Sequence, residues 1–232
     1  MSFVLPAMVP ASVPVHGTDG ARFAVHRIYC VGRNYVEHAV EMGFTGREPP
    51  FFFLKPADAV LPVREGTVGE MHYPSLTRDL HHEVELVVAI GQGGRGIKAA
   101  NAMAHVWGYA VGLDMTRRDL QAEMKKQGRP WCIGKAFEES APIGELRPAA
   151  LCKVDAETEI RLDVNGQVRQ RSSIGKLIWS IPEIIEHLSA AWTLAPGDLI
   201  YTGTPEGVAA VVAGDTLSAS IAGVGTLQIR VV

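Results

Sequence analysis

The alternation of apolar and polar side chains is clearest in the segment 82–90. Val84, Leu86, Val88 and Ile90 share one face of this segment, and Glu83, Glu85, Val87 and Ala89 share the other. A period of two predicts a β-strand with an aliphatic face turned toward a core. Shorter apolar runs predict further strands at 28–31, 51–54, 106–113 and 198–201.

Helices are predicted at about 35–42, 98–105, 116–127 and 181–191. Three of them begin with possible caps: Asn34 with Glu37, Thr116 with Asp119, and Ser180 with Glu183. Each pair has the spacing of a capping box, in which two side chains satisfy the first free N–H groups of a helix. Asn165-Gly166 separates two strand-like segments, 160–164 and 167–170, and predicts a hairpin with a type I′ turn.

The N-terminal stretch carries prolines at positions 6, 10 and 14, which are incompatible with a helix. We therefore expect an extended arm over residues 1–24, followed by one domain over residues 25–232. Many short strands and few helices give an α+β fold class.

Composition narrows the class of protein. The chain has 232 residues, 47% of them hydrophobic, and 22 Lys+Arg against 25 Asp+Glu give a net charge of −3. Such a chain can bury a sizeable core, and it lacks the basic patch of a nucleic-acid-binding protein. Three widely spaced cysteines and no long apolar run indicate a reduced, cytoplasmic protein with no membrane partner.

Three acidic residues form the first candidate site. Glu83 and Glu85 lie two apart on the predicted strand and point to the same side, and Asp114 follows another apolar strand. Two like charges on an otherwise apolar sheet repel each other, and a hard divalent cation held by oxygen atoms would offset that repulsion. An exposed strand with solvated acids explains the spacing about equally well.

Other polar residues fit a site less specifically. His38 and Glu41 are three apart on a predicted helix, and so are Arg118 and Gln121; on pattern alone, both pairs are better explained as surface pairs. Lys135 lies in an aromatic stretch, where it either reaches solvent or meets an anionic ligand. The segment 202–207 contains Thr204 and predicts a turn that presents N–H and O–H groups.

Taken together, these segments resemble the fumarylacetoacetate hydrolase family. The matching pieces are RIYCVGRNYVEHAVEMG, FFFLKPADAV, LHHEVELVVAIG, GYAVGLDMTRRDLQ, PWCIGKAF and YTGTPEGV, in family order from Arg27 onward. The chain resembles the short, single-domain branch of acylpyruvate hydrolases and oxaloacetate decarboxylases. Its GREPPFFF stretch is similar to bacterial fumarylpyruvate hydrolases of gentisate degradation.

The resemblance implies a mixed β-sheet roll with a few short helices, a homodimer, and Mg²⁺ or Mn²⁺ as cofactor. It places the metal on Glu83, Glu85 and Asp114. It assigns His38 and Glu41 to water activation and Lys135 to catalysis, and it assigns Arg118, Gln121 and Thr204 to substrate contacts.

The implied reaction is hydrolysis of the carbon–carbon bond of an acylpyruvate, a 2,4-dioxo acid, with fumarylpyruvate giving fumarate and pyruvate. Oxaloacetate decarboxylation and a related 2-oxo acid hydratase or isomerase activity are the alternatives. A second cation for the distal carboxylate is open among Arg33, Arg47 and Lys55.

Overall fold

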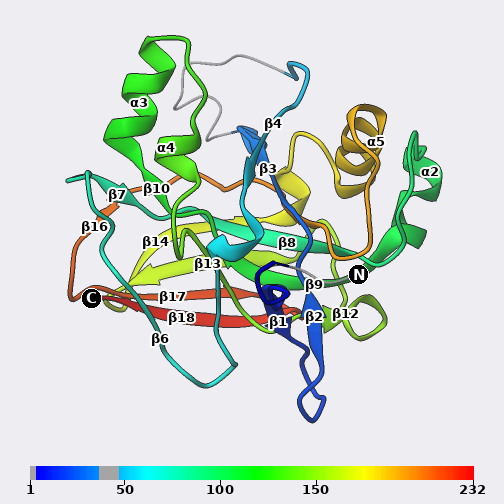
Figure 1. The fold of residues 1–232 in the computed structure, drawn as a ribbon, viewed down its shortest axis with the longest axis horizontal. Coiled ribbons are helices and arrows are strands. Elements are labelled where there is room, and N and C mark those ends of the chain that lie inside the picture. Colours follow the sequence, from blue (N-terminus) through cyan, green and yellow to red (C-terminus); the bar gives the residue numbers. More distant parts are fainter. Residues whose placement is uncertain (1–3, 37–46) are drawn as a thin grey trace.

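A computed structural model describes residues 4–36 and 47–232 and has mixed sheets with a few short helices (Figure 1). The largest sheet has, in spatial order, β4 (Phe51–Lys55), β3 (Ile28–Gly32), β15 (Leu199–Tyr201), β8 (Val84–Ile90), β9 (Val106–Leu113), β11 (Ala141–Ile143) and β5 (Val60–Pro62). β12 (Arg147–Pro148) also pairs with β9. The α+β fold class predicted from the sequence is therefore confirmed.

Three smaller sheets surround the largest one. A five-stranded sheet has the order β14 (Gln167–Ser173), β13 (Glu159–Val164), β17 (Thr216–Ile221), β18 (Gly225–Val231) and β6 (Gly69–Met71). A three-stranded sheet consists of β10 (Thr116–Arg117), β7 (Leu80–His81) and β16 (Ala210–Val211). β1 (Ser12–Pro14) pairs with β2 (Arg22–Ala24).

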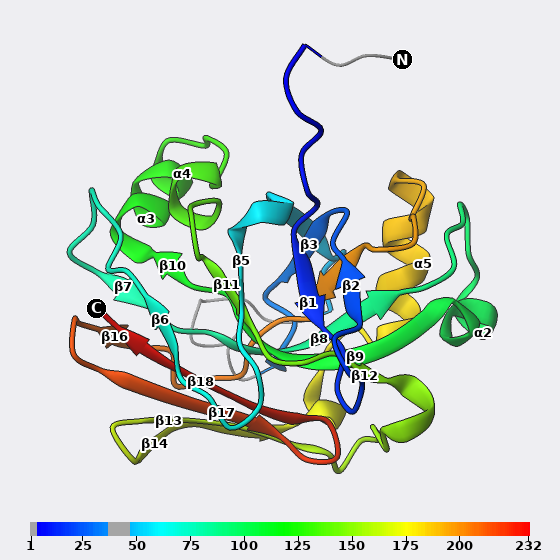
Figure 2. The same ribbon diagram turned by 60° about the horizontal axis from the view of Figure 1, so that its bottom comes forward.

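The helices lie outside the sheets (Figures 1 and 2). They are α2 (Ala99–Ala102), α3 (Arg118–Lys126), α4 (Cys132–Lys135) and α5 (Ile181–Ala191), with 3₁₀ turns at Ala57–Ala59, Met103–His105, Ala149–Leu151 and Ile174–Lys176. Within the described part of the chain, no helix has the length and apolar character needed to cross a bilayer.

The strand β8 is buried on both faces because two separate cores meet there. The aliphatic face predicted from the sequence, which includes Leu86 and Val88, packs in a core shared with the five-stranded sheet and α5. Val87 and Ala89 on the opposite face pack in a second core with β3, β15 and the β1–β2 pair. The second face of β8 is therefore apolar at Val87 and Ala89 and acidic at the start of the strand, where Glu85 lies.

Two local predictions are confirmed in detail. Asn165 and Gly166 have φ values of 52° and 76°, as a type I′ turn requires, and they join β13 to β14. Ser180 and Glu183 form a capping box at the start of α5, with the Ser180 N–H donating to Glu183 Oε2 at 2.9 Å.

The predicted capping box at Thr116 is wrong. Thr116 lies in β10, its hydroxyl donates to Glu83 Oε1 at 3.0 Å, and α3 begins two residues later. Asp119 accepts hydrogen bonds from the Thr77 hydroxyl and the Arg78 N–H. The Thr116 hydroxyl instead donates to the buried Glu83 carboxylate and accepts from the Lys135 ammonium, and hydrogen bonds to charged groups are stronger than one from a helix N–H group.

Asn34 does not use its side chain as a helix cap within the described residues. Its amide donates to the carbonyls of Trp179 and Thr202, and its Oδ1 accepts from the Trp179 N–H at 2.8 Å. Glu37, and with it most of the predicted helix 35–42, lies outside the described residues.

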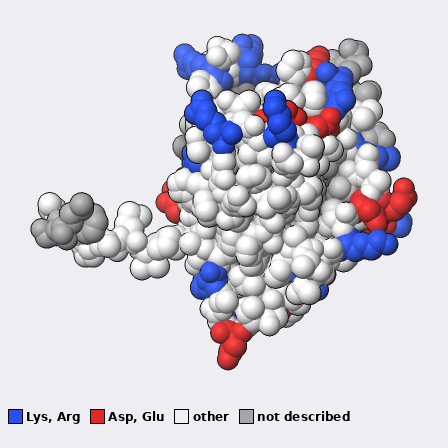
Figure 3. Space-filling view, turned by 90° about the vertical axis from the view of Figure 1, so that its right-hand side faces the viewer, with Lys and Arg blue, Asp and Glu red and all other residues white. Residues whose placement is uncertain are grey.

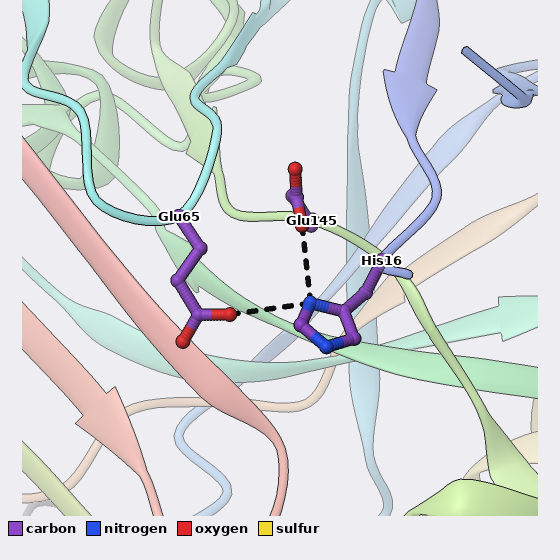
Figure 4. A group of neighbouring side chains, drawn as sticks. All are labelled: His16, Glu65 and Glu145. Carbon is purple, nitrogen blue, oxygen red and sulfur yellow. Dashed lines mark hydrogen bonds and ion pairs between the residues drawn. The ribbon is translucent and has the colours of Figure 1, made fainter. Parts of the chain in front are cut away.

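A polar cluster fastens the segment after β1 to the domain (Figure 4). His16 Nδ1 lies 3.1 Å from Glu145 Oε2 and 3.2 Å from Glu65 Oε2. The His16 N–H also donates to the carbonyl of Leu146 at 2.9 Å. Residues 4–11 lead away from the domain (Figure 2), and the boundary of the arm at residue 24 stays a prediction.

Candidate active site

The register between β8 and β9 brings three carboxylates together. These antiparallel strands pair Val84 with Leu113, so Glu83, just before one strand, lies beside Asp114, just after the other. Glu85 is opposite Gly112 and points to the same side as Glu83. Each of the three acids offers an oxygen atom, and these atoms all lie within 4.8 Å of one another.

The three carboxylates are buried, which excludes the alternative of a solvent-exposed acidic strand. The relative exposures of Glu83, Glu85 and Asp114 are 6%, 2% and 1%. Burial, and then the charges of Asp114 and Glu83, raise the pKa of Glu85 well above its ordinary value. Among the described residues, the Gly203 N–H donates a hydrogen bond to Glu85 Oε2 at 2.7 Å. One donor N–H offsets only part of the cost of a buried charge.

Lys135 points into this acidic cluster and not toward solvent. From the end of α4, its ammonium donates to Asp114 Oδ2 at 2.6 Å, to Glu83 Oε1 at 3.1 Å and to the Thr116 hydroxyl at 2.6 Å. Burial opposes its charge, yet Asp114 and Glu83 raise the pKa of Lys135 above the ordinary value. The partners of Lys135 are therefore carboxylates of the protein, in place of the solvent or the anionic ligand expected from the sequence.

Arg118 and Gln121, on α3, reach the same cluster. Arg118 Nη2 donates to Glu83 Oε1, and its Nη1 donates to Gln121 Oε1 at 2.6 Å. Its Nε donates to His81 Nδ1 at 3.4 Å, and His81 Nε2 lies 2.8 Å from Asp79 Oδ1. This arrangement assigns His81 the neutral tautomer with hydrogen on Nε2, and the His81–Asp79 pair orients the guanidinium.

Thr204 is held beside Glu85 by Gln170. The Gln170 side chain donates to the Thr204 hydroxyl at 2.8 Å and accepts from the Val84 N–H at 3.1 Å. Its Oε1 also lies 3.0 Å from His82 Nδ1. Burial lowers the pKa of His82 to about 4, so this histidine is neutral near pH 7. Gln170 lies in the middle of β14, and the sequence gave no signal for this role.

Lys55 also belongs to the acidic cluster. The ammonium at the end of β4 lies 2.9 Å from Asp114 Oδ1 and donates to the backbone carbonyls of Met115 and Lys135. With 2% exposure it has no route to the distal end of a substrate, so we discard that possible role. Lys55 lies in the aromatic run FFFLKP, as Lys135 lies in its own aromatic stretch. A lysine in such a stretch is unusual, and this feature of the sequence marks both residues as candidate buried lysines.

We expect Lys55→Met to lower the free energy of unfolding by about 3–5 kcal/mol, because it removes one partner of a buried ion pair. Denaturant titration of the metal-free protein measures the change. The matched control is Lys98→Met, which removes an exposed pair with Glu186 and should cost less than about 1 kcal/mol. Equal effects in the two variants would contradict the structural role of Lys55.

The aromatic rings of Phe53 and Trp131 form one wall of the cavity. Phe51 and Phe53 on β4 contact Trp131, with ring centroids 5.3 and 5.9 Å apart. The Phe51 ring lies against Gly32, where a Cβ atom would come within 2.0 Å of it. Glycine at this position therefore allows the Phe51 ring to pack against the backbone beside Arg33. Gly32 and Arg33 line the cavity together with the three carboxylates and Lys135.

The structure thus brings together seven of the nine site residues expected from the sequence: Glu83, Glu85, Asp114, Lys135, Arg118, Gln121 and Thr204. The other two, His38 and Glu41, lie outside the described residues.

The donor set fits a hard divalent cation. All three candidate ligands are carboxylates, and oxygen-only sites favour Mg²⁺, Mn²⁺ or Ca²⁺ over zinc. The raised pKa of Glu85 shows that its negative charge lacks full compensation from the protein. A bound cation would supply that compensation.

Comparison with known proteins agrees with this geometry. Residues 27–232 match the model of the fumarylacetoacetate (FAA) hydrolase C-terminal family. A crystal structure of fumarylpyruvate hydrolase from Pseudomonas aeruginosa, in complex with Mn²⁺ and pyruvate, is 55% identical, with a TM-score of 0.97 over 100% of this chain and 99% of that one.

Relatives with other activities are also similar. The mitochondrial oxaloacetate tautomerase FAHD1 of Rattus norvegicus is 45% identical over 88% of this chain and 90% of its own length. A 5-carboxymethyl-2-hydroxymuconate delta-isomerase structure from Mycobacterium smegmatis is 38% identical, with a TM-score of 0.78 over 91% and 80% of the two chains. Motifs, fold and site geometry agree, and the chain belongs to the fumarylacetoacetate hydrolase family.

Proposed function

We propose that this enzyme is a divalent-metal-dependent acylpyruvate hydrolase that cleaves fumarylpyruvate into fumarate and pyruvate in aromatic degradation. The observation that carries the proposal is the buried set of Glu83, Glu85 and Asp114 with Lys135 beside it. Its support is the whole-chain similarity to a fumarylpyruvate hydrolase that holds Mn²⁺ and pyruvate.

In this proposal, Glu83, Glu85 and Asp114 hold Mg²⁺ or Mn²⁺. When bound, the metal supplies positive charge that polarises the 2-oxo group of the substrate. Lys135 adds a fixed ammonium in a site from which water is largely excluded, where its charge acts strongly on a developing oxyanion. Arg118, Gln121 and Thr204 bind and orient the pyruvoyl end of the substrate.

Water attack is assigned to His38, oriented by Glu41, on the basis of the family resemblance. His38 takes a proton from water, and the water oxygen bonds to the distal carbonyl carbon. The bond between that carbon and the adjacent methylene carbon then breaks. The electron pair passes to the pyruvoyl fragment, which takes up a proton and leaves as pyruvate, and the acyl fragment leaves as a carboxylic acid.

A substrate comparison tests the proposal. We expect the Mn²⁺-loaded protein to hydrolyse fumarylpyruvate with a kcat/KM at least tenfold above its values for acetylpyruvate hydrolysis and for oxaloacetate decarboxylation or tautomerisation. Chelation of the metal should abolish the hydrolysis, and Mn²⁺ or Mg²⁺ should restore it. An enzyme that prefers oxaloacetate, the activity in the name of the FAHD1 relatives, would overturn the assignment.

We further propose a homodimer located in the cytoplasm. Figure 3 shows a broad face whose centre carries no Lys, Arg, Asp or Glu, with charged side chains around its edge. Such a face is suited to burial against a second subunit. Light scattering should give a mass twice the 25.0 kDa of one chain, and a monomer at micromolar concentration would contradict the proposal.

A further inference from the structure

Arg33 lies at the rim of the candidate active site, on the residue that follows β3. It lines the same cavity as Glu85, Asp114 and Lys135. Its backbone has a φ of 57°, a left-handed conformation that a non-glycine residue seldom adopts. Such conformations concentrate at ligand-binding sites, where the surrounding structure holds them in place.

The Arg33 guanidinium is held against an aromatic ring. Its Cζ lies 5.1 Å from the centroid of Phe51, the ring that rests on Gly32 and meets Trp131 edge to face. Burial lowers the pKa of Arg33 from its ordinary value, while Glu48 acts in the opposite direction. A partly desolvated guanidinium gains more from a bound carboxylate than one in open water does.

The sequence left three candidate cations for the distal carboxylate, and the structure favours Arg33 over Lys55 and Arg47. Lys55 is buried in its contacts with Asp114 and two backbone carbonyls. Arg47 pairs with Glu183, and its Cζ lies 4.2 Å from the Trp179 ring centroid. Neither residue lines the cavity that contains the three carboxylates.

We propose that Arg33 binds the distal carboxylate of the substrate, so that the enzyme is selective for planar, conjugated 2,4-dioxo diacids over monoacids. The inference rests on the proposed function. The pyruvoyl end lies at the carboxylate cluster and Lys135, and the other end reaches Arg33. The unsaturated segment between them is flat, and it lies along the wall formed by Phe53 and Trp131, where aromatic faces favour a conjugated chain.

Two substrates isolate this contact. Fumarylpyruvate and acetylpyruvate share the pyruvoyl end, but only fumarylpyruvate has a second carboxylate. In Arg33→Gln we expect the ratio of their kcat/KM values, fumarylpyruvate over acetylpyruvate, to fall about 10- to 100-fold, the usual worth of a hydrogen bond to a charged group. Acetylpyruvate hydrolysis and inhibition by oxalate, which matches only the pyruvoyl end, should stay within about twofold of the parent.

Two further variants serve as controls. Arg33→Lys keeps the charge without the planar fork and should recover part of the ratio. Arg129→Gln removes an exposed arginine that lines a neighbouring pocket with Phe51 and Trp131 but not the cavity of the carboxylates, and it should leave the ratio unchanged. An equal loss for both substrates in Arg33→Gln, or a loss of ratio in Arg129→Gln instead, would overturn the inference.

Calorimetry separates this inference from the proposed function. Binding of the two acids to the Mn²⁺-loaded protein reports on Arg33 even when neither acid is hydrolysed. A parent protein that binds fumarylpyruvate more tightly than acetylpyruvate, with the difference lost in Arg33→Gln, supports the contact whatever reaction follows. Equal binding of both acids by the parent refutes the contact.

Discussion

Replacement of Glu85 by glutamine should have opposite effects on metal binding and on the metal-free fold. Glu85→Gln removes one of the three proposed ligands, and we expect Mn²⁺ affinity to fall more than about 100-fold, beyond the loss typical of a residue that only supports a ligand. Hydrolysis should fall with it. Glu83→Ala and Asp114→Ala should likewise abolish metal binding and activity. Isothermal titration calorimetry and steady-state rates measure both effects.

The metal-free Glu85→Gln protein should be more stable than the parent near pH 7. Burial and the adjacent carboxylates raise the pKa of Glu85, so its ionised form opposes folding. Protonated Glu85 does not oppose folding, and this contribution to stability is fully present below the ordinary pKa of a glutamate. It is lost as pH rises through the raised pKa that Glu85 has in the folded protein. The gain of the variant should therefore disappear in acid, and each kcal/mol should raise Tm by about 2–4 °C.

Glu83→Gln is the matched control, because Glu83 has the opposite electrostatic surroundings. Its carboxylate accepts from Lys135, Arg118 and Thr116, so the neutral amide leaves buried cations with less compensation. We expect this variant to lose Mn²⁺ affinity and also to lose metal-free stability. Unchanged Mn²⁺ affinity in Glu85→Gln, or stability changes of the same sign in both variants, would contradict the assigned metal site.

The local structure of the site could be predicted from the sequence, because it depends on interactions between residues that are close in the chain. Alternation along 82–90 identified a strand with Glu83 and Glu85 on one side, and Asn165-Gly166 and Ser180 to Glu183 fixed a turn and a helix start. Each feature depends on neighbours within a few residues, so a pattern alone predicts it.

The pairing of strands across the sheet could not be predicted from such a local pattern. Asp114 lies beside Glu83 only because Val84 pairs with Leu113, and a shift of one residue would turn the acids to the opposite face. The partner of Lys135 and the burial of Lys55 depend on that same register. Thr116 shows the limit most clearly, since its capping spacing was outweighed by an acceptor 33 positions away in the chain.

The family resemblance suggested functional roles for residues whose roles neither the sequence pattern nor the described geometry determines. It favoured a substrate-binding role for Arg118 and Gln121 over a surface pair. In the structure, Arg118 donates to both Glu83 and Gln121. For His38 and Glu41 it remains the sole basis, because both lie outside the described residues. A functional test of this pair therefore adds more than another variant of the carboxylate cluster.

His38→Ala should separate water activation from binding. The variant should bind Mn²⁺ and oxalate about as well as the parent, because Glu83, Glu85 and Asp114 are intact. Its hydrolysis of fumarylpyruvate should fall by roughly 10²–10⁴-fold, the usual worth of a positioned general base. Single-turnover rates at saturating Mn²⁺ measure the loss, and calorimetry with oxalate measures binding.

Glu41→Gln should lose less activity, because a neutral amide still orients the imidazole of His38 but cannot stabilise its protonated form. Decarboxylation of oxaloacetate, where the parent shows it, should suffer less than hydrolysis in both variants, since carbon dioxide leaves without attack by water. Hydrolysis by His38→Ala within about tenfold of the parent would place the base elsewhere. Among the described residues near the carboxylates, His81 and His82 already have partners in Asp79 and Gln170, so such a result would require a base other than these histidines and His38.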